Sequence, residues 1–515
     1  MKLAIRICFL LLSLPLWLPA QTPKAGPRVN TIYGMLEGAR ATDGILVFKG
    51  IPYAAAPVGP LRWQEPQAPL SWKGIRQATQ FGHKPLQTAV YSDMVSRADS
   101  MSEDCLYLNV WTAATGSKKA MPVLVYIHGG GLYAGDGSEF RYDGASMARL
   151  GIVTVTINYR LGIFGFLAHP ALSKASPHHS SGNYGVLDQV AALQWVQQNI
   201  AAFGGDPRNI TIAGQSAGAV SVTTLVATPL AKGLFHKAIA QSGSILGSRM
   251  PSTLRTEESK GGQLMQLTGA KDLEALRKLP AKELLALYGN EGTPRFGIST
   301  DGYLLPKDPR EIFTYGQQAD IPILSGWNNG ETGSILGSAP HAPEQFEQTV
   351  QKLYGNRAAT ILALYPHKDS VETVQSAIDL ATDRFAGYNT WKWIDMHSKT
   401  NGFPVYRYLF CRTAPSHPSA KGGALHSAEI PYAMGNLALV SGIQWTAADQ
   451  QLSATMQLYF ANFIKTGNPN GSNLPKWPGL QSSIPKVMVL DTNTRIENEK
   501  GLRRYLYFDQ TNNAY

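Results

Sequence analysis

The chain has 515 residues, of which 44% are hydrophobic and 16% charged, with 50 Gly and 32 Pro. This composition is typical of a globular protein with a large core and many turns, and it excludes a disordered or fibrous chain. The formal net charge is +10, but Lys and Arg are scattered without a run of five or six, which favours an ordinary solvated surface over a nucleic-acid-binding patch.

The first twenty residues have the pattern of a secretory signal peptide. A basic start, MKLAIR, is followed by an apolar run of about a dozen residues and by the small residue Ala20. The run is shorter than the ~20 residues that a spanning helix needs, and Pro15 interrupts it. Cys8 lies at the start of the run, which argues against a lipoprotein. We expect cleavage near Ala20 and export, without a membrane anchor, to the periplasm or the extracellular space.

Beyond the signal peptide, the pattern predicts a small antiparallel meander and then a parallel sheet. Residues 27–63 alternate short apolar runs with turn residues, as a meander does. After them, apolar runs typical of buried strands alternate with helical stretches, which indicates βαβ units. These runs are VLVYIHGG from Val123, IVTVTINYR from Ile152, NITIAG from Asn209 and KAIAQSGS from Lys237.

The helical stretches and the absence of dividing segments predict one large domain. The clearest helix covers 184–202, where apolar residues recur at spacings of three and four and form one stripe. A mixed helical and loop segment follows at 251–322, strands resume at IPILSG and VYRYLF, and a last long helix is expected over 447–465. No linker, charge run, repeat or low-complexity tract divides the chain. We therefore expect a single domain over 21–515, with insertions over its active face.

The strongest local signal is the pentapeptide Gly214-Gln215-Ser216-Ala217-Gly218, which lies between the strand NITIA and the helical stretch AVSVTTL. A serine hydroxyl is a poor nucleophile unless a base removes its proton and a tight strand-to-helix turn exposes it. Glycine on each side avoids a Cβ where strand and helix come close. The motif alone arises by chance in many proteins, but this context predicts Ser216 as a nucleophile.

A glycine-rich segment, His128-Gly129-Gly130-Gly131, follows the strand VLVYI. Attack on an ester carbonyl places negative charge on its oxygen, and fixed backbone N–H groups directed at that charge lower the barrier. Glycines let these amides approach without side chains in the way. A plain glycine turn is the alternative, but a nucleophile turn in the same chain favours the catalytic interpretation. We assign Gly130, Gly131 and the amide of Ala217 to an oxyanion hole.

A base and an acid should follow the nucleophile, in the order Ser, Asp or Glu, His. A lone histidine is more often a surface or core residue than a base, and six follow Ser216: His236, His341, His367, His397, His417 and His426. His426 lies in the loop-like stretch GGALHSAEIPYAMGN after the strand VYRYLF, where a catalytic histidine is expected. Glu331 follows the strand IPIL and is the preferred acid. Asp301 is the rival, but it precedes that strand.

These motifs and their surroundings resemble the carboxylesterase/cholinesterase family, the type-B carboxylesterases, which includes para-nitrobenzyl-esterase-like proteins. The similar segments cover nearly the whole mature chain and include FKGIPYAAAPVGPLRW, SEDCLYLNVW, PVLVYIHGGGL, NYRLGIFGF, GLFHKAIAQSGS, HSAEIPYAMGN and NFIKTGNPNG. The resemblance implies an α/β-hydrolase fold, with a large, mostly parallel central sheet flanked by helices. It also implies that no metal and no cofactor are needed.

The resemblance also assigns residues. It implies that Ser216, Glu331 and His426 form a triad, that Gly130, Gly131 and Ala217 form the oxyanion hole, and that Arg62 and Glu103 form a structural ion pair. The chain departs from the family at Gln215, where Glu is usual, so a preference for cationic substrates is not expected although catalysis should survive.

The cysteines are a second departure. After signal cleavage Cys105 and Cys411 remain, and composition allows either one bridge or two buried thiols. The family often pairs the cysteine of the EDCLYLN segment with one upstream, yet QFGHKPLQ contains none. The resemblance therefore implies that Cys105 is unpaired, and it gives no support for a bridge to Cys411.

We hypothesise a serine esterase in which His426, oriented by Glu331, activates Ser216 to form an acyl-enzyme that water then hydrolyses. The partners are a small ester and water. An amidase or lipase-like hydrolase is the alternative, because the acyl-transfer machinery does not specify the leaving group. A binding protein on a hydrolase scaffold is a further alternative, but such proteins typically lose the nucleophile or the base. Tyr133, Trp391 and Trp393 could line the substrate site, although aromatic residues at such positions are more often core.

Overall fold

The computed structural model describes residues 26–88, 91, 93–116, 119–247, 251–288, 290–332, 342–415, 422–480 and 485–511. The expected signal peptide, His341 and His417 lie outside the described residues. Within the described ranges, no helix is both long enough and apolar enough to span a bilayer.

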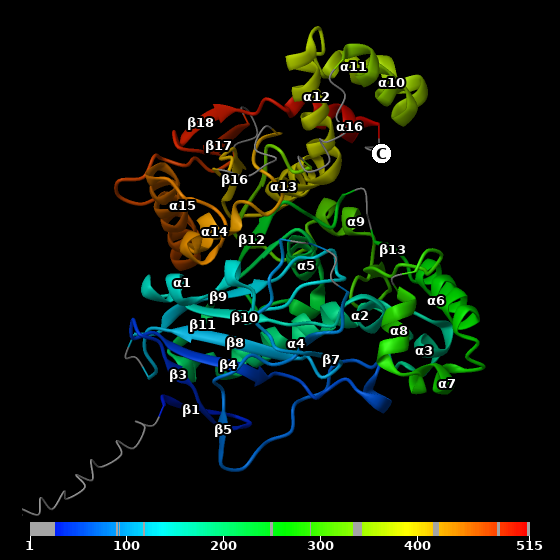
Figure 1. Ribbon diagram of the computed structural model, residues 1–515, viewed down its shortest axis with the longest axis vertical. Helices are drawn as coiled ribbons and strands as arrows, with labels where there is room; N and C mark the ends of the chain where they lie inside the picture. The colour runs from blue at the N-terminus through cyan, green and yellow to red at the C-terminus, as the bar shows by residue number, and fades with distance from the viewer. Residues whose placement is uncertain are drawn as a thin grey trace, which may run out of the picture.

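An 11-stranded mixed sheet forms the centre of the molecule (Figure 1). Its parallel strands, in spatial order, are β17 (Lys486–Leu490), β16 (Val405–Phe410), β15 (Ile323–Asn328), β12 (Lys237–Gln241), β11 (Gly205–Gln215), β9 (Met121–Ile127) and β10 (Val153–Ile157). Antiparallel strands continue it at both edges, β18 (Arg495–Asn498) on one side and β8 (Tyr107–Thr112), β4 (Leu46–Pro52) and β3 (Ala39–Arg40) on the other. The predicted buried strands are confirmed and form this parallel centre.

Helices cover both faces of the sheet, and the alternating side chains of β9 show how. Val123 and Val125 belong to the core cluster that includes residues of α4 (Tyr184–Asn199) and α5 (Ala217–Ala227). Leu124 and Tyr126 belong to a second cluster, with residues of α14 (Ile430–Met434) and α15 (Ala447–Thr466). Because successive side chains of a strand point to opposite faces, a strand covered on both faces is apolar throughout.

The two predicted long helices are present, with small differences at their ends. The helix expected over 184–202 ends as α4 at Asn199, and a 3-10 turn, η3 (Ile200–Phe203), follows it. The helix expected over 447–465 is α15, which begins with a capping box between Thr446 and Asp449 and ends at Gly467 in the left-handed conformation. Both caps satisfy backbone groups that a helix end leaves without partners.

The N-terminal strands divide between two sheets. β1 (Arg28–Thr31) and β2 (Gly34–Glu37) form an antiparallel pair that β5 (Ile75–Gln77) extends in parallel. β3 and β4 instead pair with the edge of the central sheet. The small antiparallel unit therefore holds only the first two strands of the region 27–63, because β4 presents an apolar run that the core buries.

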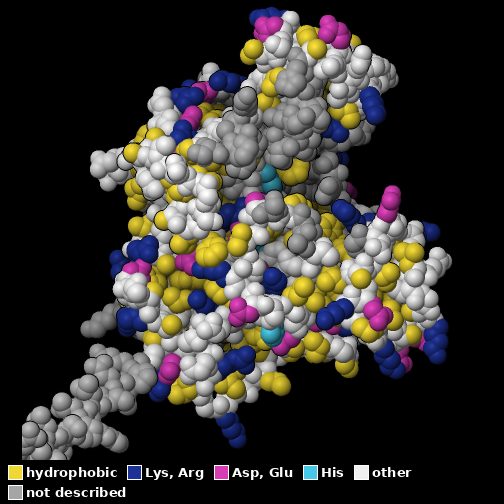
Figure 2. All heavy atoms as spheres, viewed as in Figure 1, with side chains coloured by type: hydrophobic (Ala, Val, Ile, Leu, Met, Phe, Trp, Pro, Cys, Tyr) yellow, Lys and Arg dark blue, Asp and Glu magenta, His cyan; other side chains and the backbone are white. Residues whose placement is uncertain are grey.

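Two structural implications of the sequence are confirmed. Arg62 donates two hydrogen bonds of 2.6 Å to the carboxylate of Glu103, so the expected ion pair is bidentate and largely buried. Cys105 and Cys411 are both free thiols. On the face shown in Figure 2, basic and acidic side chains are interspersed, without a large patch of one sign.

Candidate active site

Ser216 occupies a sharp turn between the last residue of β11 and the first residue of α5. Its backbone has φ 58° and ψ −122°, a conformation that costs energy for a residue with a Cβ and that clusters at active sites. The flanking glycines are required by space. A Cβ on Gly214 would lie 2.5 Å from the backbone of Gly218, and a Cβ on Gly218 would lie 2.2 Å from the carbonyl oxygen of Ile127.

The glycine segment after β9 lies directly against this turn. A Cβ on Gly129 would lie 2.6 Å from the carbonyl oxygen of Gln215 and 3.3 Å from Cβ of Ser216. Gly130 and Gly131 have φ values of 96° and 67°, which glycine adopts without strain. Among described residues, their N–H groups donate to no protein acceptor.

Ala217 contributes a third donor of the same kind. It is the first residue of α5, so its N–H has no partner within the helix. The adjacent His128 is buried and stacks on Tyr159 with ring centroids 4.4 Å apart. Burial lowers the pKa of His128 to about 4, so this histidine is neutral at physiological pH. It supports the segment and is not a base.

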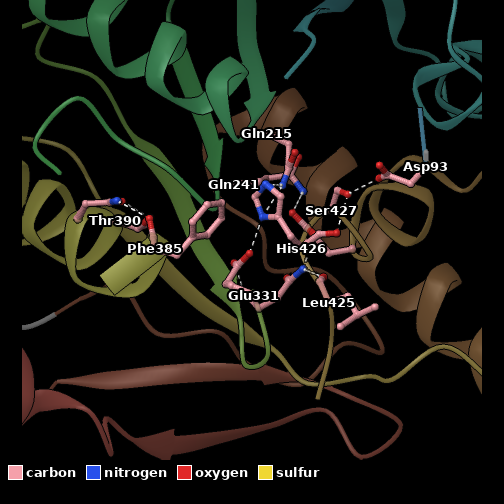
Figure 3. A network of polar contacts seen from close by, with 12 residues as sticks. Asp93, Gln215, Gln241, Glu331, Phe385, Thr390, Leu425, His426 and Ser427 are labelled. Atoms are coloured by element: carbon pink, nitrogen blue, oxygen red, sulfur yellow. Dashed lines mark hydrogen bonds and ion pairs between the residues drawn. The ribbon is translucent and has the colours of Figure 1, made fainter. Parts of the chain in front are cut away.

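His426 and Glu331 lie in direct contact although 95 residues separate them (Figure 3). Nδ1 of His426 donates to Oε2 of Glu331 at 2.5 Å, and the N–H of Asn328 donates to Oε1 at 2.8 Å. Glu331 is 3% exposed. Burial disfavours the charged imidazolium, but the charge and hydrogen bond of Glu331 outweigh it, and the pKa of His426 is raised. The contact fixes the tautomer that leaves Nε2 as the basic nitrogen.

Ser216 itself makes no hydrogen bond with His426, although both residues are described. Next to the imidazole lies instead the side chain of Gln215, whose Nε2 is 3.3 Å from each ring nitrogen. Hydrogen bonds of catalytic groups are often long without substrate and shorten in the reactive complex.

A second buried acid, Glu429, lies behind the histidine and escaped the sequence analysis. It is fully buried, and its carboxylate accepts from Nδ2 of Asn328 at 2.6 Å and from Nε2 of Gln241 at 3.4 Å. Burial and the charge of Glu331 raise the pKa of Glu429 to about 7. The only sequence signal is its position three residues after His426.

Two further groups border His426. The ring of Phe385 meets the imidazole edge-on, with centroids 4.8 Å apart, and Phe385 is 45% exposed. On another side, the hydroxyl of Ser427 donates to Asp93 at 3.1 Å, and Nη1 of Arg141 donates to both of these side chains. Phe385, Asp93 and Arg141 come from segments remote from His426 in sequence, so no local pattern indicated these contacts.

The rival candidates lie elsewhere. Asp301 accepts from Nδ2 of Asn183 at 2.9 Å and from two backbone N–H groups, so it fixes a loop. His236, His367 and His397 bond to backbone groups. Trp391 and Trp393 belong to the core, whereas Tyr133 packs near Gly131. Within the described ranges, no cluster of His, Cys, Asp and Glu has the arrangement of a metal site.

The family whose sequence model matches this chain is described as the carboxylesterase family, and the match covers residues 25–507. The chain belongs to the carboxylesterase family. It is a carboxylic ester hydrolase with the α/β-hydrolase fold.

Individual relatives agree with this membership. This carboxylesterase is 35% identical to the para-nitrobenzyl esterase of Bacillus subtilis (strain 168), over 92% of this chain and 96% of that protein. It is 36% identical to the medium-chain fatty acyl-CoA hydrolase precursor of Anas platyrhynchos, over 88% and 86%. The crystal structure of a Geobacillus stearothermophilus carboxylesterase superimposes with a TM-score of 0.80 at 35% identity and covers 93% of this chain and 99% of that chain.

Proposed function

We propose that this carboxylesterase is an exported serine enzyme that hydrolyses small carboxylic esters through an acyl-enzyme on Ser216. The observation that carries the proposal is the 2.5 Å hydrogen bond between His426 and Glu331, beside a strained serine turn. A base held in one tautomer, near a partly exposed serine on such a turn, is the arrangement that activates a serine.

The first half of the reaction forms the acyl-enzyme. Nε2 of His426 takes the proton of Ser216 as the hydroxyl oxygen attacks the ester carbonyl. The imidazolium gains stability from the carboxylate of Glu331, which accepts its Nδ1–H. The same histidine then gives the proton to the leaving alkoxide, and the alcohol departs. In the second half, His426 takes a proton from water as the water oxygen attacks the acyl carbonyl. The bond between the acyl carbon and the Ser216 oxygen then breaks, His426 returns the proton to that oxygen, and the acid is released.

We propose Gly130, Gly131 and Ala217 as the oxyanion hole of this reaction. The segment that holds the two glycines meets the serine turn at Gly129, and no described protein acceptor competes for the N–H groups of Gly130 and Gly131. Loss of one such donor typically reduces kcat by ~10²–10³.

The alternatives are distinguished by the substrate. The amidase or lipase-like hydrolase would use the same residues, so only the leaving group or the substrate's physical state separates it from the esterase. A small ester is favoured because relatives at 35% identity include a para-nitrobenzyl esterase. The binding-protein alternative has no supporting observation, because the proposed nucleophile, base and acid are all present.

We also propose that residues 1–20 are a cleaved signal peptide and that residues 21–515 form one domain. The basic start and short apolar run support export. The 11-stranded sheet contains strands from both ends of the described chain, from β3 to β18, which supports the single domain.

The test is hydrolysis of p-nitrophenyl esters of increasing acyl length by the purified mature protein. We expect activity that peaks at one chain length, a burst of p-nitrophenol equal to the enzyme concentration under conditions where deacylation is slow, and losses of several orders of magnitude in Ser216→Ala and His426→Ala. The variants should keep the native circular dichroism. Near-normal activity in either variant would overturn the assignment.

A further inference from the structure

The carboxamide of Gln215 lies on the face of the His426 ring. Nε2 of Gln215 is equidistant, at 3.3 Å, from both ring nitrogens. An amide nitrogen in the ring plane at these distances would collide with Cε1 between the two nitrogens, so it must lie above the ring. Nδ1 already donates to Glu331, so it cannot also accept from the amide. The contact is therefore an N–H to π-face contact, which is weak in itself.

The position of this side chain is fixed by the sheet. Gln215 is the last residue of β11, it is 4% exposed, and it pairs in register with Gln241 of β12. Its Oε1 lies on the side of the oxyanion segment, 3.4 Å from where a Cβ of Gly129 would be. Gln215 and Glu331 thus reach the imidazole from different directions (Figure 3).

Several charged groups lie around His426, in addition to the ring of Phe385. They are Glu331 after β15, Glu429 before α14, Asp93 through Ser427, and Arg141 of η2 (Phe140–Tyr142) beside Asp93. Two of the three acids are buried, and all three favour the imidazolium over the neutral base. Gln215, by contrast, places an uncharged polar side chain against the face of the ring.

We propose that Gln215 is a positioning residue that keeps the face of His426 free of charge, so that this esterase retains its neutral base to lower pH than it would with a carboxylate at this position. The inference rests on the proposed function, because it assumes that His426 is the base. It concerns a residue that neither binds the reacting atoms nor belongs to the triad.

The physical reason is the short distance. A carboxylate at residue 215 would lie within about 4 Å of both ring nitrogens in a buried site, and an opposite charge at such a distance shifts a pKa by ~1–3 units toward the charged form. It would also place a third acid beside Glu331 and Glu429. A carboxamide avoids both effects, and it can present either its N–H or its oxygen to the ring, as the neutral or the protonated imidazole requires.

The experiment is the pH dependence of kcat/KM for a neutral p-nitrophenyl ester, which reports the pKa of the base in the free enzyme. Product is followed at a wavelength where the absorbance of p-nitrophenol does not change with pH. At low pH, kcat/KM falls as the base becomes protonated, and we call this part of the profile the acid limb. In Gln215→Glu we expect the acid limb to move to higher pH by about one pH unit or more. In Gln215→Met, which removes the amide without adding charge, the limb should stay at the native position while kcat/KM falls.

A matched control places the same charge one strand away. Gln241→Glu puts a carboxylate beside Glu429, which Gln241 contacts at 3.4 Å, and it should move the limb less than Gln215→Glu. An unchanged limb in Gln215→Glu, or equal shifts in the two Glu variants, would overturn the proposal.

If Gln215→Glu hydrolyses the ester too slowly for a kcat/KM profile, a second measurement gives the same pKa. The rate at which phenylmethylsulfonyl fluoride modifies Ser216 needs the same base, and its acid limb should show the same upward shift; an unshifted limb contradicts the inference. Ser216→Ala separates the two hypotheses. If that variant keeps esterase activity, the proposed function fails; if it is inactive while Gln215→Glu leaves the limb unmoved, only the role of Gln215 fails.

Discussion

At the residue scale, the carboxyl groups of Glu331 and Glu429 near His426 differ in their charge because they have different partners. Glu331 binds the imidazole directly, at 2.5 Å. Glu429 is fully buried, and its carboxylate receives hydrogen bonds from the side-chain amides of Asn328 and Gln241. With a pKa of about 7, Glu429 is largely protonated below neutrality. The charge that holds the His426 ring is therefore that of Glu331.

The raised pKa of Glu429 predicts a pH-dependent stability. Folding raises this pKa from 4.5 to about 7, so the protonated form is favoured in the folded state and the stability it contributes is lost as pH rises through 7. Glu429→Gln cannot ionise. Relative to the native protein, its free energy of unfolding should therefore improve by on the order of 3 kcal/mol between about pH 5 and about pH 8.

Urea denaturation at both pH values measures this difference. Glu274→Gln is the control, because Glu274 is 76% exposed and should show no comparable change. If the gap between Glu429→Gln and the native protein were constant over this pH range, the burial argument would be wrong.

At the element scale, a π-helix brings an aromatic ring to the candidate site. Between α12 (Ser370–Thr382) and α13 (Tyr388–Thr400), residues Asp383–Gly387 adopt this wider helix, a feature frequent at functional sites. On its buried side, Asp383 accepts from Tyr365 at 2.8 Å and pairs with Arg504 at 2.6 Å. On its open side, Phe385 meets His426. The buried ion pair thus holds the segment that presents the ring.

We expect Phe385→Ala to raise KM for esters with long acyl chains by about threefold to tenfold, because roughly 1 kcal/mol of apolar contact is lost. Esters with short acyl chains, which reach the ring less, should change little. Phe403→Ala is the matched control, since Phe403 is 50% exposed on a loop before β16. Steady-state kinetics over the ester series measures the effect, and an equal change at all chain lengths would contradict a contact with the acyl chain.

At the scale of the whole molecule, one ion pair joins three segments of the chain. Arg62 binds Glu103 through two hydrogen bonds, and its remaining nitrogen donates to the carbonyl oxygens of Arg277 and Leu279 at 2.8 and 2.7 Å. These carbonyls end α7 (Leu273–Lys278). The guanidinium therefore fastens the helical segment beyond β12 to the N-terminal part of the fold.

Glu103→Gln should lower stability by about 3 kcal/mol, because it leaves the buried charge of Arg62 uncompensated. The thermal midpoint at a fixed scan rate measures the loss. For comparison, Glu37→Gln breaks an ion pair whose partner, Arg28, is 48% exposed, and it should lower stability far less than Glu103→Gln does. Equal effects of the two substitutions would refute a structural role for the buried pair.

The parts of this protein that the sequence by itself determined are those set by local geometry. The strands of the parallel centre are apolar throughout because both faces are covered, so their composition is visible along the chain. The turn at Ser216 needs glycine at 214 and 218 because a Cβ at either position would meet backbone atoms within 2.5 Å. Such steric requirements restrict which residues can occupy adjacent positions, so they can be recognised in a short stretch of sequence.

The tertiary structure decided which distant side chains meet. His426 and Glu331 were predicted from their loops and from a family resemblance, but their contact depends on the adjacency of β15 and β16. Glu429, the Gln215 face contact and Phe385 depend on the strand order and on a π-helix, and no spacing along the chain encodes these. The same holds for β4, whose apolar run is buried at the edge of the central sheet, and for β3, which pairs with β4.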